Sequence, residues 1–303
     1  MNLVVGGTGS LGGKIANRLL EQGEPVRALV RPSSRYHALE AAGAEIIFGD
    51  LCDPGSLAKA CKGVQTVLTT VTAPLAERHV ESVVNAIDWH GYESLIDAAR
   101  SAGVDQFIYT SFLGASAEAP HPLVHAKGAT EAYLRASGLT YTILQPVMFM
   151  ETWVGFALGA QLAQGPVVTI VGDGVNKLGF VAEDDVRDLA VAVIGKQDAR
   201  NAAIPISGPA SYTYREVISL IEEVLGRELA IKMVPAGGAV SGMPPILNEL
   251  WAIFAGAGDV ILDSTPVARR YHLKLGNMET YIRRTFGHGP LAEQFSAALS
   301  AAV

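Results

Sequence analysis

The chain opens with an alternation of apolar runs and amphipathic stretches that is typical of an α/β protein. An apolar run at 3–5 leads into a glycine-rich turn. Beyond the turn, Leu11, Ile15 and Leu19 recur at the spacing of one helical face, and a second apolar run follows at 26–30. The pattern therefore predicts strand, turn, helix and strand over the first thirty residues.

The same alternation continues as far as Pro146. Further strands are expected at 44–48, 66–71, 106–110 and 141–144, and helices at 56–61, 80–102 and 130–136. Strands and helices that alternate in this way form a parallel, doubly wound sheet with helices on both faces. We therefore expect a Rossmann-type α/β fold, with its ligand crevice beyond the carboxyl ends of the strands.

After Pro146 the pattern becomes less regular. Helices are expected at 149–164, 181–194 and 213–225, a strand at 167–171, and a surface helix from Ile282 into an Ala-rich tail. Thr213 and Glu216 have the spacing of a capping box. The apolar stretch 245–262 is too short and too polar to cross a bilayer, so a buried or lid-like helix is expected there. We expect 148–303 to form a smaller substrate-binding region packed on the domain 1–147, with some segments returning to the Rossmann core.

Composition narrows the class of protein. Of the 303 residues, 49% are hydrophobic and 17% charged, which is typical of a packed globule. The net charge of −7 argues against nucleic acid as a partner. Two cysteines are too few for a disulfide framework and lack metal-ligand spacing, and the chain opens directly with a core strand. We therefore expect a cytoplasmic monomer or homodimer with no metal, no membrane span and no signal peptide.

The glycine-rich turn is the strongest candidate for a binding site. It reads Gly6-Gly7-Thr8-Gly9-Ser10-Leu11-Gly12 and lies between a strand and a helix. In such a turn one glycine allows the tight bend, one lets the backbone approach a pyrophosphate, and one lets helix and strand pack closely. The helix N-terminus then offers free N–H groups and a partial positive charge to the phosphates. This context predicts a dinucleotide site.

Arg31 indicates which dinucleotide is bound. In NAD-specific sites an acidic residue about 20 residues after the turn binds the ribose 2′-hydroxyl. Here Arg31 ends the second strand, and Arg35 follows closely. A guanidinium pairs with a 2′-phosphate, which a carboxylate would repel. The sequence therefore predicts NADP(H) as the cofactor, the alternative being that Arg31 and Arg35 are ordinary solvated residues.

With these residues in view, the chain resembles the atypical short-chain dehydrogenase/reductases of the NmrA-like group. That group includes triphenylmethane reductase, quinone reductases, isoflavone reductase-like enzymes and non-catalytic cofactor sensors. The segments that carry the resemblance are GGTGSLGG, VRPSS, GDLCDPGSL, IDWHGYESLIDAARSAGVDQFIYTS, HAKGATEAYLRASGLTYTILQP and FVAEDDVRDLA. The IDWHG segment also resembles photosystem assembly factors of the group, so a protein without catalytic activity is a second possibility.

The resemblance implies a role for each matching residue. Lys127 would bind the nicotinamide ribose and is the candidate catalytic residue, either as a proton donor or only by positioning the ribose. Asp50 would accept from the adenine amino group. The full set of implied cofactor contacts is Gly6, Thr8, Gly9, Ser10, Leu11, Gly12, Arg31, Asp50, Leu51, Thr72, Ser111, Lys127, Pro146 and Val147. Phe112, Phe149 and Trp153 are expected to bind substrate, although they suit a plain core equally well.

Two departures from the superfamily pattern change the expected chemistry. The tyrosine that normally lies four residues before the lysine is Leu123 here, and the helper serine is Phe112. Ketone reduction or sugar epimerisation that needs a tyrosine proton donor is therefore not expected. Gln145 stands where the group usually has an arginine, which weakens the case for an anionic substrate.

The sequence therefore leaves two functions open. The first is an NADPH-dependent oxidoreductase that transfers a hydride to an apolar, conjugated or aromatic acceptor such as a quinone or an enone. Positioning of the acceptor would supply most of its rate. The second is a non-catalytic NADP(H)-binding redox sensor or assembly factor. Intact glycines and Lys127 favour the enzyme, and the missing tyrosine favours the sensor.

Overall fold

The computed structural model describes residues 1–73 and 80–287. The chain divides into two units that each draw on several separate segments. Unit 1 comprises Met1–Pro146, Val186–Ile206 and Arg270–Leu273. Unit 2 comprises Val147–Asp185, Ser207–Arg269 and the residues from Lys274 onward.

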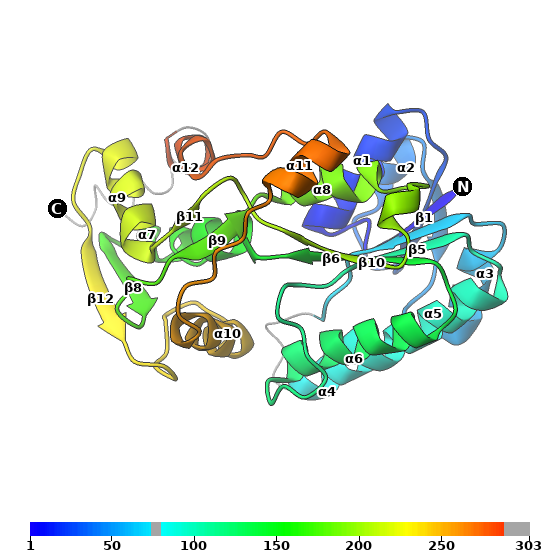
Figure 1. Cartoon of the computed structure of the whole chain (residues 1–303), viewed down its shortest axis with the longest axis horizontal. Helices are drawn as coiled ribbons and strands as arrows, with labels where there is room; N and C mark the ends of the chain where they lie inside the picture. Colours follow the sequence, from blue (N-terminus) through cyan, green and yellow to red (C-terminus); the bar gives the residue numbers. More distant parts are fainter. Residues whose placement is uncertain (74–79, 288–303) are drawn as a thin grey trace. The chain divides into compact units, whose positions relative to one another are not determined.

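Unit 1 is built on a seven-stranded parallel sheet in the order β10-β6-β5-β4-β1-β2-β3 (Figure 1). Its strands are β1 (Asn2–Val5), β2 (Val26–Val30), β3 (Glu45–Phe48), β4 (Thr66–Thr69), β5 (Gln106–Thr110), β6 (Tyr141–Pro146) and β10 (Ala202–Ile206). The strand order reverses direction at β1, and the glycine turn follows that strand. The predicted Rossmann-type α/β fold is confirmed.

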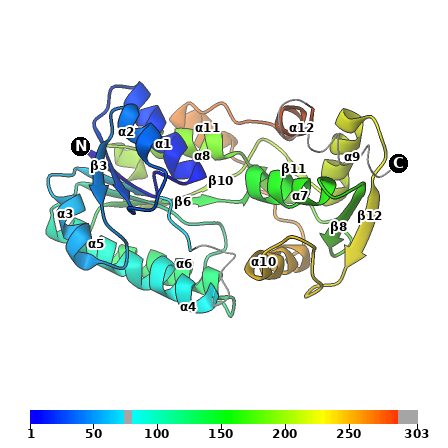
Figure 2. The ribbon, with the colours of Figure 1, turned by 180° about the vertical axis from the view of Figure 1, so that it is seen from behind.

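Helices cover both faces of this sheet, as Figures 1 and 2 show. One face carries α1 (Ser10–Glu21), α2 (His37–Ala41) and the part of α8 (Glu183–Ala192) that belongs to unit 1. The other face carries α3 (Pro54–Cys61), α5 (Tyr92–Ser101) and α6 (Pro122–Ala136). The short helix α4 (Val80–Val84) leads through a π-helix at Asn85–Gly91 into α5, and a 3₁₀ turn at Gln197–Ala199 precedes β10.

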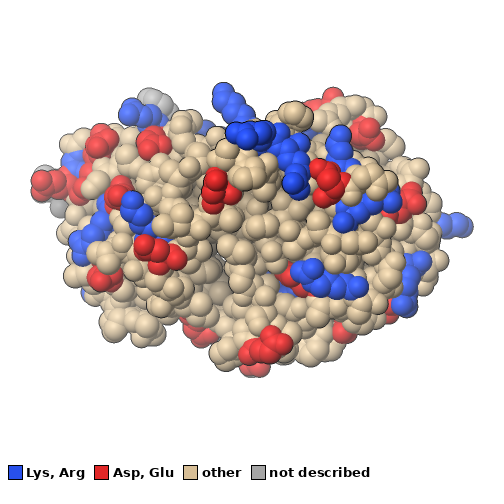
Figure 3. All heavy atoms as spheres, in the orientation of Figure 1, with Lys and Arg blue, Asp and Glu red and all other residues tan. Residues whose placement is uncertain are grey.

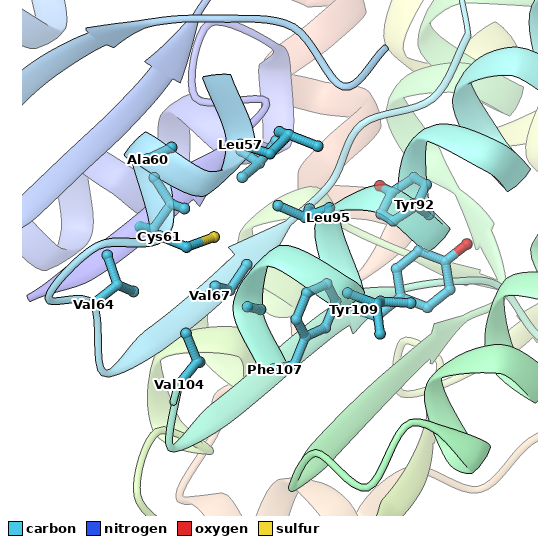
Figure 4. Close-up of a cluster of buried hydrophobic side chains, with 14 of the residues drawn as sticks. Leu57, Ala60, Cys61, Val64, Val67, Tyr92, Leu95, Val104, Phe107 and Tyr109 are labelled. Atoms are coloured by element: carbon cyan, nitrogen blue, oxygen red, sulfur yellow. The ribbon is translucent and has the colours of Figure 1, made fainter. Parts of the chain in front are cut away.

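One part of the core of unit 1 lies between the sheet and the second of these helical layers, while buried side chains of α1 such as Ile15 and Leu19 pack on the other face. Figure 4 shows side chains of α3, β4, α5 and β5 packed together beneath the second layer. Leu57, Leu95 and Phe107 are fully buried in this cluster. Tyr92 and Tyr109 close one end of it with their rings 4.9 Å apart. This packing fixes the π-helix and α5 against the ends of β4 and β5, where the candidate site residues lie.

Unit 2 contains two small sheets and several helices. β7 (Met148–Phe149), β9 (Leu178–Val181) and β11 (Ser211–Tyr212) form one sheet, and β8 (Val167–Val171) pairs in parallel with β12 (Ala230–Val234) in the other. Its helical elements are a π-helix (Glu151–Phe156), α7 (Gly159–Leu162), α9 (Tyr214–Leu225), α10 (Pro245–Gly256), most of α11 (Thr265–Tyr271) and α12 (Met278–Phe286).

Several predicted elements differ from the observed ones. The helix expected at 130–136 begins at Pro122, because proline at N1 is compatible with a helix start. The helix expected at 149–164 is instead a short strand, a π-helix and one turn of α-helix. The helix predicted from Ile282 is observed as the second half of α12, which begins four residues earlier and exposes Arg283 and Arg284 while it buries Ile282. The Ala-rich tail beyond it lies outside the described residues.

Candidate functional site

The glycine turn joins β1 to α1 through backbone contacts that leave no room for side chains. Gly6 has φ +94°, a conformation that L side chains rarely adopt, and its carbonyl accepts a hydrogen bond from Gly9 N at 2.9 Å. A Cβ at Gly12 would lie 2.2 Å from that same carbonyl oxygen and 2.7 Å from Thr70 Oγ1. Gly12 therefore serves the close packing of the helix on the turn, as the sequence predicted for one of the glycines.

The front of the turn is exposed, and the helix that follows it begins without a side-chain cap. Thr8, Gly9 and Ser10 are exposed, whereas Leu11 is buried and could offer a ligand only its backbone. The N-cap of α1 is Gly9, which supplies no side-chain hydrogen bond, and the first turn of α1 contains no acidic residue. A helix start without a cap or carboxylate suits the phosphates of a dinucleotide. These residues fit a pyrophosphate group.

Arg31 lies at the end of β2, the neighbour of β1 in the sheet. Its side chain is exposed, and within the described ranges it forms no ion pair with any carboxylate. The same holds for Arg35. A guanidinium that pairs with no carboxylate in the described ranges is available to a 2′-phosphate. The position of Arg31 is therefore compatible with NADP(H), the cofactor that the sequence predicts.

Asp50 and Leu51 follow β3, which is the next strand in the sheet. Asp50 Oδ1 accepts a hydrogen bond from Cys52 N at 2.8 Å, and Asp50 N donates to Ser56 Oγ at 3.1 Å. Leu51 is buried, with 6% of its surface exposed. These contacts hold the loop after β3 in one conformation at the carboxyl edge of the sheet, and their predicted contact with adenine stays a prediction.

Thr72 and Ser111 follow the two strands on the other side of β1. Thr72 is exposed in the loop after β4. Ser111 is buried directly after β5, its N–H donates to Leu144 O at 2.9 Å, and its Oγ finds no hydrogen-bond partner in the described part of the chain. A buried hydroxyl without a partner is uncommon in proteins and is consistent with a ligand contact.

Lys127 lies on α6 and is almost entirely buried. Its Nζ lies 3.4 Å from Oδ1 of Asp88, a fully buried carboxylate on the π-helix, and 5.4 Å from the centre of the Tyr109 ring. The other oxygen of Asp88, Oδ2, accepts a hydrogen bond from Ala73 N at 2.7 Å. Thr130 Oγ1 donates to the backbone carbonyl of Asp88 at 2.7 Å. The predicted lysine is thus part of a buried ion pair.

Two tyrosines lie close to this ion pair, but neither has an acidic hydroxyl. Tyr92 Oη accepts from Thr69 Oγ1 at 2.9 Å and donates to Val71 O at 2.7 Å. Burial raises the pKa of Tyr92, and burial next to Tyr92 raises the pKa of Tyr109. Figure 4 shows that both side chains belong to the core. They do not replace the tyrosine that the sequence lacks.

The positions of that missing tyrosine and its helper serine are apolar in the structure as well. Leu123 lies in the first turn of α6, one turn before Lys127, and is buried. Phe112 is half-buried directly after Ser111. No hydroxyl at these two positions can donate a proton to a substrate, which agrees with the expectation from the sequence.

The residues predicted at the nicotinamide loop and the substrate wall divide between the units. Pro146 ends β6 in unit 1, and its carbonyl accepts from Leu113 N at 2.9 Å. Val147 and Phe149 are half-buried in unit 2. Trp153, also in unit 2, packs edge-on against Trp251 and Phe254, with ring centres 6.0 and 5.5 Å apart. The structure gives Trp153 a packing role, and its contact with substrate stays a prediction.

Gln145 has a structural partner that the sequence did not suggest. Its Nε2 donates to both carboxylate oxygens of Glu131 on α6, at 2.9 and 3.1 Å. Arg135 bonds to the same buried carboxylate at 2.9 Å. The side chain at position 145 therefore serves the contact between β6 and α6. Its identity carries no information about the charge of a substrate.

Asp88 is the site residue that sequence reasoning missed. It lies on the apolar stripe of the 80–102 segment, between Val84 and Tyr92, both of which are buried. Burying a carboxylate within such a stripe costs free energy unless a cation pairs with it. The place of Asp88 on the stripe was therefore the sequence signal for a buried partner. Its partner Lys127 could not be identified from spacing alone, because the two residues lie on different helical segments.

Other classes of site are absent from the described ranges. Residues 1–73 and 80–287 contain no group of three or more His, Cys, Asp or Glu side chains that could hold a metal. Within the same ranges, every helix is too short or too polar to cross a membrane. Figure 3 shows basic and acidic side chains interspersed on the face it draws.

The parallel sheet with a glycine turn after its first strand defines a Rossmann-like protein of the dinucleotide-binding type. The profile of the NmrA-like family matches residues 2–280, and the chain belongs to this family.

Its relatives include both enzymes and assembly factors. The chain is 30% identical over 262 residues to an NAD(P)H azoreductase of Xenophilus azovorans, covering 84% of this chain and 87% of the relative. It is 31% identical over 234 residues to the photosystem II assembly factor Ycf39 of a Synechocystis strain, covering 77% of this chain and 70% of the relative. Membership of the family therefore does not by itself decide between the two functions.

Solved structures share the fold over nearly the whole chain. The NADPH complex of the Escherichia coli quinone oxidoreductase QOR2 aligns with a TM-score of 0.76 and 21% identity, covering 94% of this chain and all of that one. The NADP(H) complex of triphenylmethane reductase from a Citrobacter species aligns with a TM-score of 0.69 and 23% identity, covering 99% of this chain and all of that one. At this identity the likeness establishes the fold alone.

Proposed function

We propose that this chain binds NADP(H) at the glycine turn of unit 1 and is an oxidoreductase that reduces an apolar, conjugated or aromatic acceptor such as a quinone or an enone. The observation that carries the proposal is the start of α1, where the N-cap Gly9 supplies no side-chain cap, beside the exposed Arg31, which pairs with no carboxylate among residues 1–73 and 80–287. The relatives named as an azoreductase and as quinone and triphenylmethane reductases support it.

Each part of the cofactor would be held by different residues of the site. Backbone N–H groups in the first turn of α1, such as those of Leu11 and Gly12, would hold the pyrophosphate, and Arg31 would pair with the 2′-phosphate. Lys127 would hold the hydroxyls of the nicotinamide ribose. When bound, NADPH supplies the hydride. Because Leu123 and Phe112 bear no hydroxyl, we expect acceptors whose reduction does not depend on a protein tyrosine as proton donor.

Phe112 and Phe149 are the proposed apolar contacts for the acceptor. Each is half-buried, so each keeps ring surface that a flat ligand could cover. Trp153 is a further proposed contact, although it is only 5% exposed.

Cofactor choice is tested by titration calorimetry with NADPH and NADH. We expect NADPH to bind at least tenfold more tightly, a difference of about 1.4 kcal/mol. Arg31→Asp should reverse the order, since it replaces the phosphate partner with a repelling carboxylate. Lys59→Asp is a control of equal charge change at an exposed position of α3, and it should leave the preference as it is. Equal affinities in the unmodified protein would refute this part of the proposal.

Turnover is tested by anaerobic mixing of the protein with NADPH and a panel of quinones, enones and conjugated dyes. Oxidation of NADPH by at least one acceptor supports the enzyme. Lys127→Ala should then lower kcat/KM roughly ten- to a thousandfold, or about 1.4–4 kcal/mol of transition-state stabilisation. Tight NADPH binding with no oxidation by any acceptor would refute it.

The alternative is a non-catalytic NADP(H) sensor or assembly factor. It is favoured by the absence of hydroxyls at Leu123 and Phe112 and by the relatives named as photosystem II assembly factors. Binding of NADPH without turnover in the same panel is the result that this alternative predicts.

A further inference from the structure

The ion pair between Asp88 and Lys127 is buried and fixed from several directions. Asp88 has no exposed surface, and 7% of Lys127 is exposed. Asp88 is anchored to the loop after β4 through Ala73 N and to α6 through Thr130. Neither anchor uses Oδ1, the oxygen that faces the lysine. The carboxylate is thus held in place independently of Lys127.

The N–H groups of the Lys127 ammonium, by contrast, remain available to a ligand. Its Nζ lies 3.4 Å from Asp88 Oδ1, longer than the 2.7–2.9 Å typical of a charge-assisted hydrogen bond. Among residues 1–73 and 80–287, Nζ makes no hydrogen bond, and Oδ1 has no hydrogen-bond partner either. The carboxylate compensates the charge of the ammonium without occupying its N–H groups. Such an arrangement is suited to a lysine that must stay charged and still bind something else.

We propose that Asp88 is the positioning residue for Lys127: its fixed carboxylate holds the lysine side chain in place and directed at the nicotinamide ribose, so that Lys127 acts in cofactor binding. This inference rests on the proposed function. It assigns a role to the IDWHG segment, whose aspartate the cofactor contacts do not otherwise use. The π-helix at Asn85–Gly91 brings this aspartate to the lysine.

The test compares the affinity for the whole cofactor with the affinity for 2′,5′-ADP, its adenosine half. Asp88→Asn keeps the shape of the side chain and an oxygen that can accept from Ala73 N, but it removes the charge that faces Lys127. We expect the affinity for NADPH to fall at least fivefold and the affinity for NADH to fall by the same factor. Binding of 2′,5′-ADP, which has no nicotinamide ribose, should be unchanged.

The control is Asp97→Asn, the same substitution nine residues further along the same helical run. Asp97 pairs with Arg100 at the surface, so this variant should leave all three affinities unchanged. Equal losses for NADPH and 2′,5′-ADP in Asp88→Asn would mean that Asp88 only supports the fold, and unchanged NADPH affinity would mean that it does not position Lys127. Either result overturns the inference.

A double variant provides a second test, which adds stability as a readout to the NADPH affinity. Lys127→Met leaves Asp88 as a buried charge without a counter-charge, whereas Asp88→Asn with Lys127→Met makes the pair neutral. We expect the double variant to have a higher urea midpoint than Lys127→Met and the same NADPH affinity as that variant. A double variant that is less stable than Lys127→Met, or that binds NADPH more weakly, overturns the inference.

The failure of this inference can be told apart from the failure of the proposed function. If the unmodified protein binds neither NADPH nor 2′,5′-ADP, the proposed function fails, and the inference fails with it. If the unmodified protein binds both and Asp88→Asn does not discriminate between them, only the inference fails.

Discussion

Replacing Gly12 with alanine tests whether the close packing of α1 on the glycine turn requires a residue without a side chain. The new Cβ would lie 2.2 Å from Gly6 O, 2.7 Å from Gly6 C and 2.7 Å from Thr70 Oγ1. To restore an ordinary contact of 3.4 Å, α1 and the turn would have to separate by about 1.2 Å at this point. Two of the three neighbours are backbone atoms and cannot rotate away.

The expected cost lies at the upper end of that for overpacking a protein core, about 3 kcal/mol. This is a large share of the 5–15 kcal/mol that typically stabilises a domain. Gly9→Ala should behave differently, because its Cβ would meet only Gly6 O, at 3.3 Å, and φ −83° suits alanine. We expect it to lose about 1 kcal/mol or less of stability but to bind NADPH at least tenfold more weakly, since the methyl group would face the pyrophosphate.

Urea unfolding and NADPH titration together separate the two glycines. Gly256→Ala is the control, because its Cβ would meet nothing within 4 Å and it should shift stability by no more than about 1 kcal/mol. Loss of stability in Gly12→Ala without loss in Gly9→Ala is the expected pattern. If Gly12→Ala unfolds at the same urea concentration as the unmodified protein, the packing argument is wrong.

Three further predictions concern single contacts. Gln145→Leu should cost about 1–3 kcal/mol in urea unfolding, because Glu131 loses two hydrogen bonds in a buried place; no loss would mean that water replaces them. Thr213→Ala should cost about 1 kcal/mol by removing the capping box of α9, and an unchanged midpoint would contradict it. Burial raises the pKa of Cys61 to about 11, and partial burial beside Asp50 also raises the pKa of the exposed Cys52. A thiol reagent at pH 8 should therefore label Cys52 slowly and Cys61 only after unfolding, and labelling of both thiols at the same rate in the folded protein would refute this.

The parts of the fold that depend on local pattern were predictable. Strand, turn and helix around Gly6 to Leu19 follow from short-range periodicity, and the capping box at Thr213 follows from two residues three positions apart. The strand Gln106–Thr110 is apolar, short and bounded by turn residues, and it was predicted with its observed bounds.

The parts that depend on tertiary contacts were not predictable. The helix that carries Lys127 begins eight residues earlier than expected, because its first turns contain the poor helix formers Pro122, Val124 and Gly128, which are stabilised there by packing within unit 1. The pairing of Asp88 with Lys127 joins two segments 39 residues apart through a π-helix that no periodicity indicates. The helix expected from Ile282 begins four residues earlier, because Met278 and Tyr281 also pack on its buried face.

The sheet of unit 1 contains a strand that is translated long after its neighbour, and this has a consequence for synthesis on the ribosome. The edge strand β10 completes the sheet of unit 1 beside β6, yet residues 147–201 separate the two strands in the sequence. At about 5–20 residues per second, roughly 3–11 s pass between translation of β6 and of β10. Throughout that interval β6 can present unpaired N–H and C=O groups to another nascent chain. A fragment that ends near residue 147 would keep that edge permanently, so we expect it to aggregate when it is expressed alone.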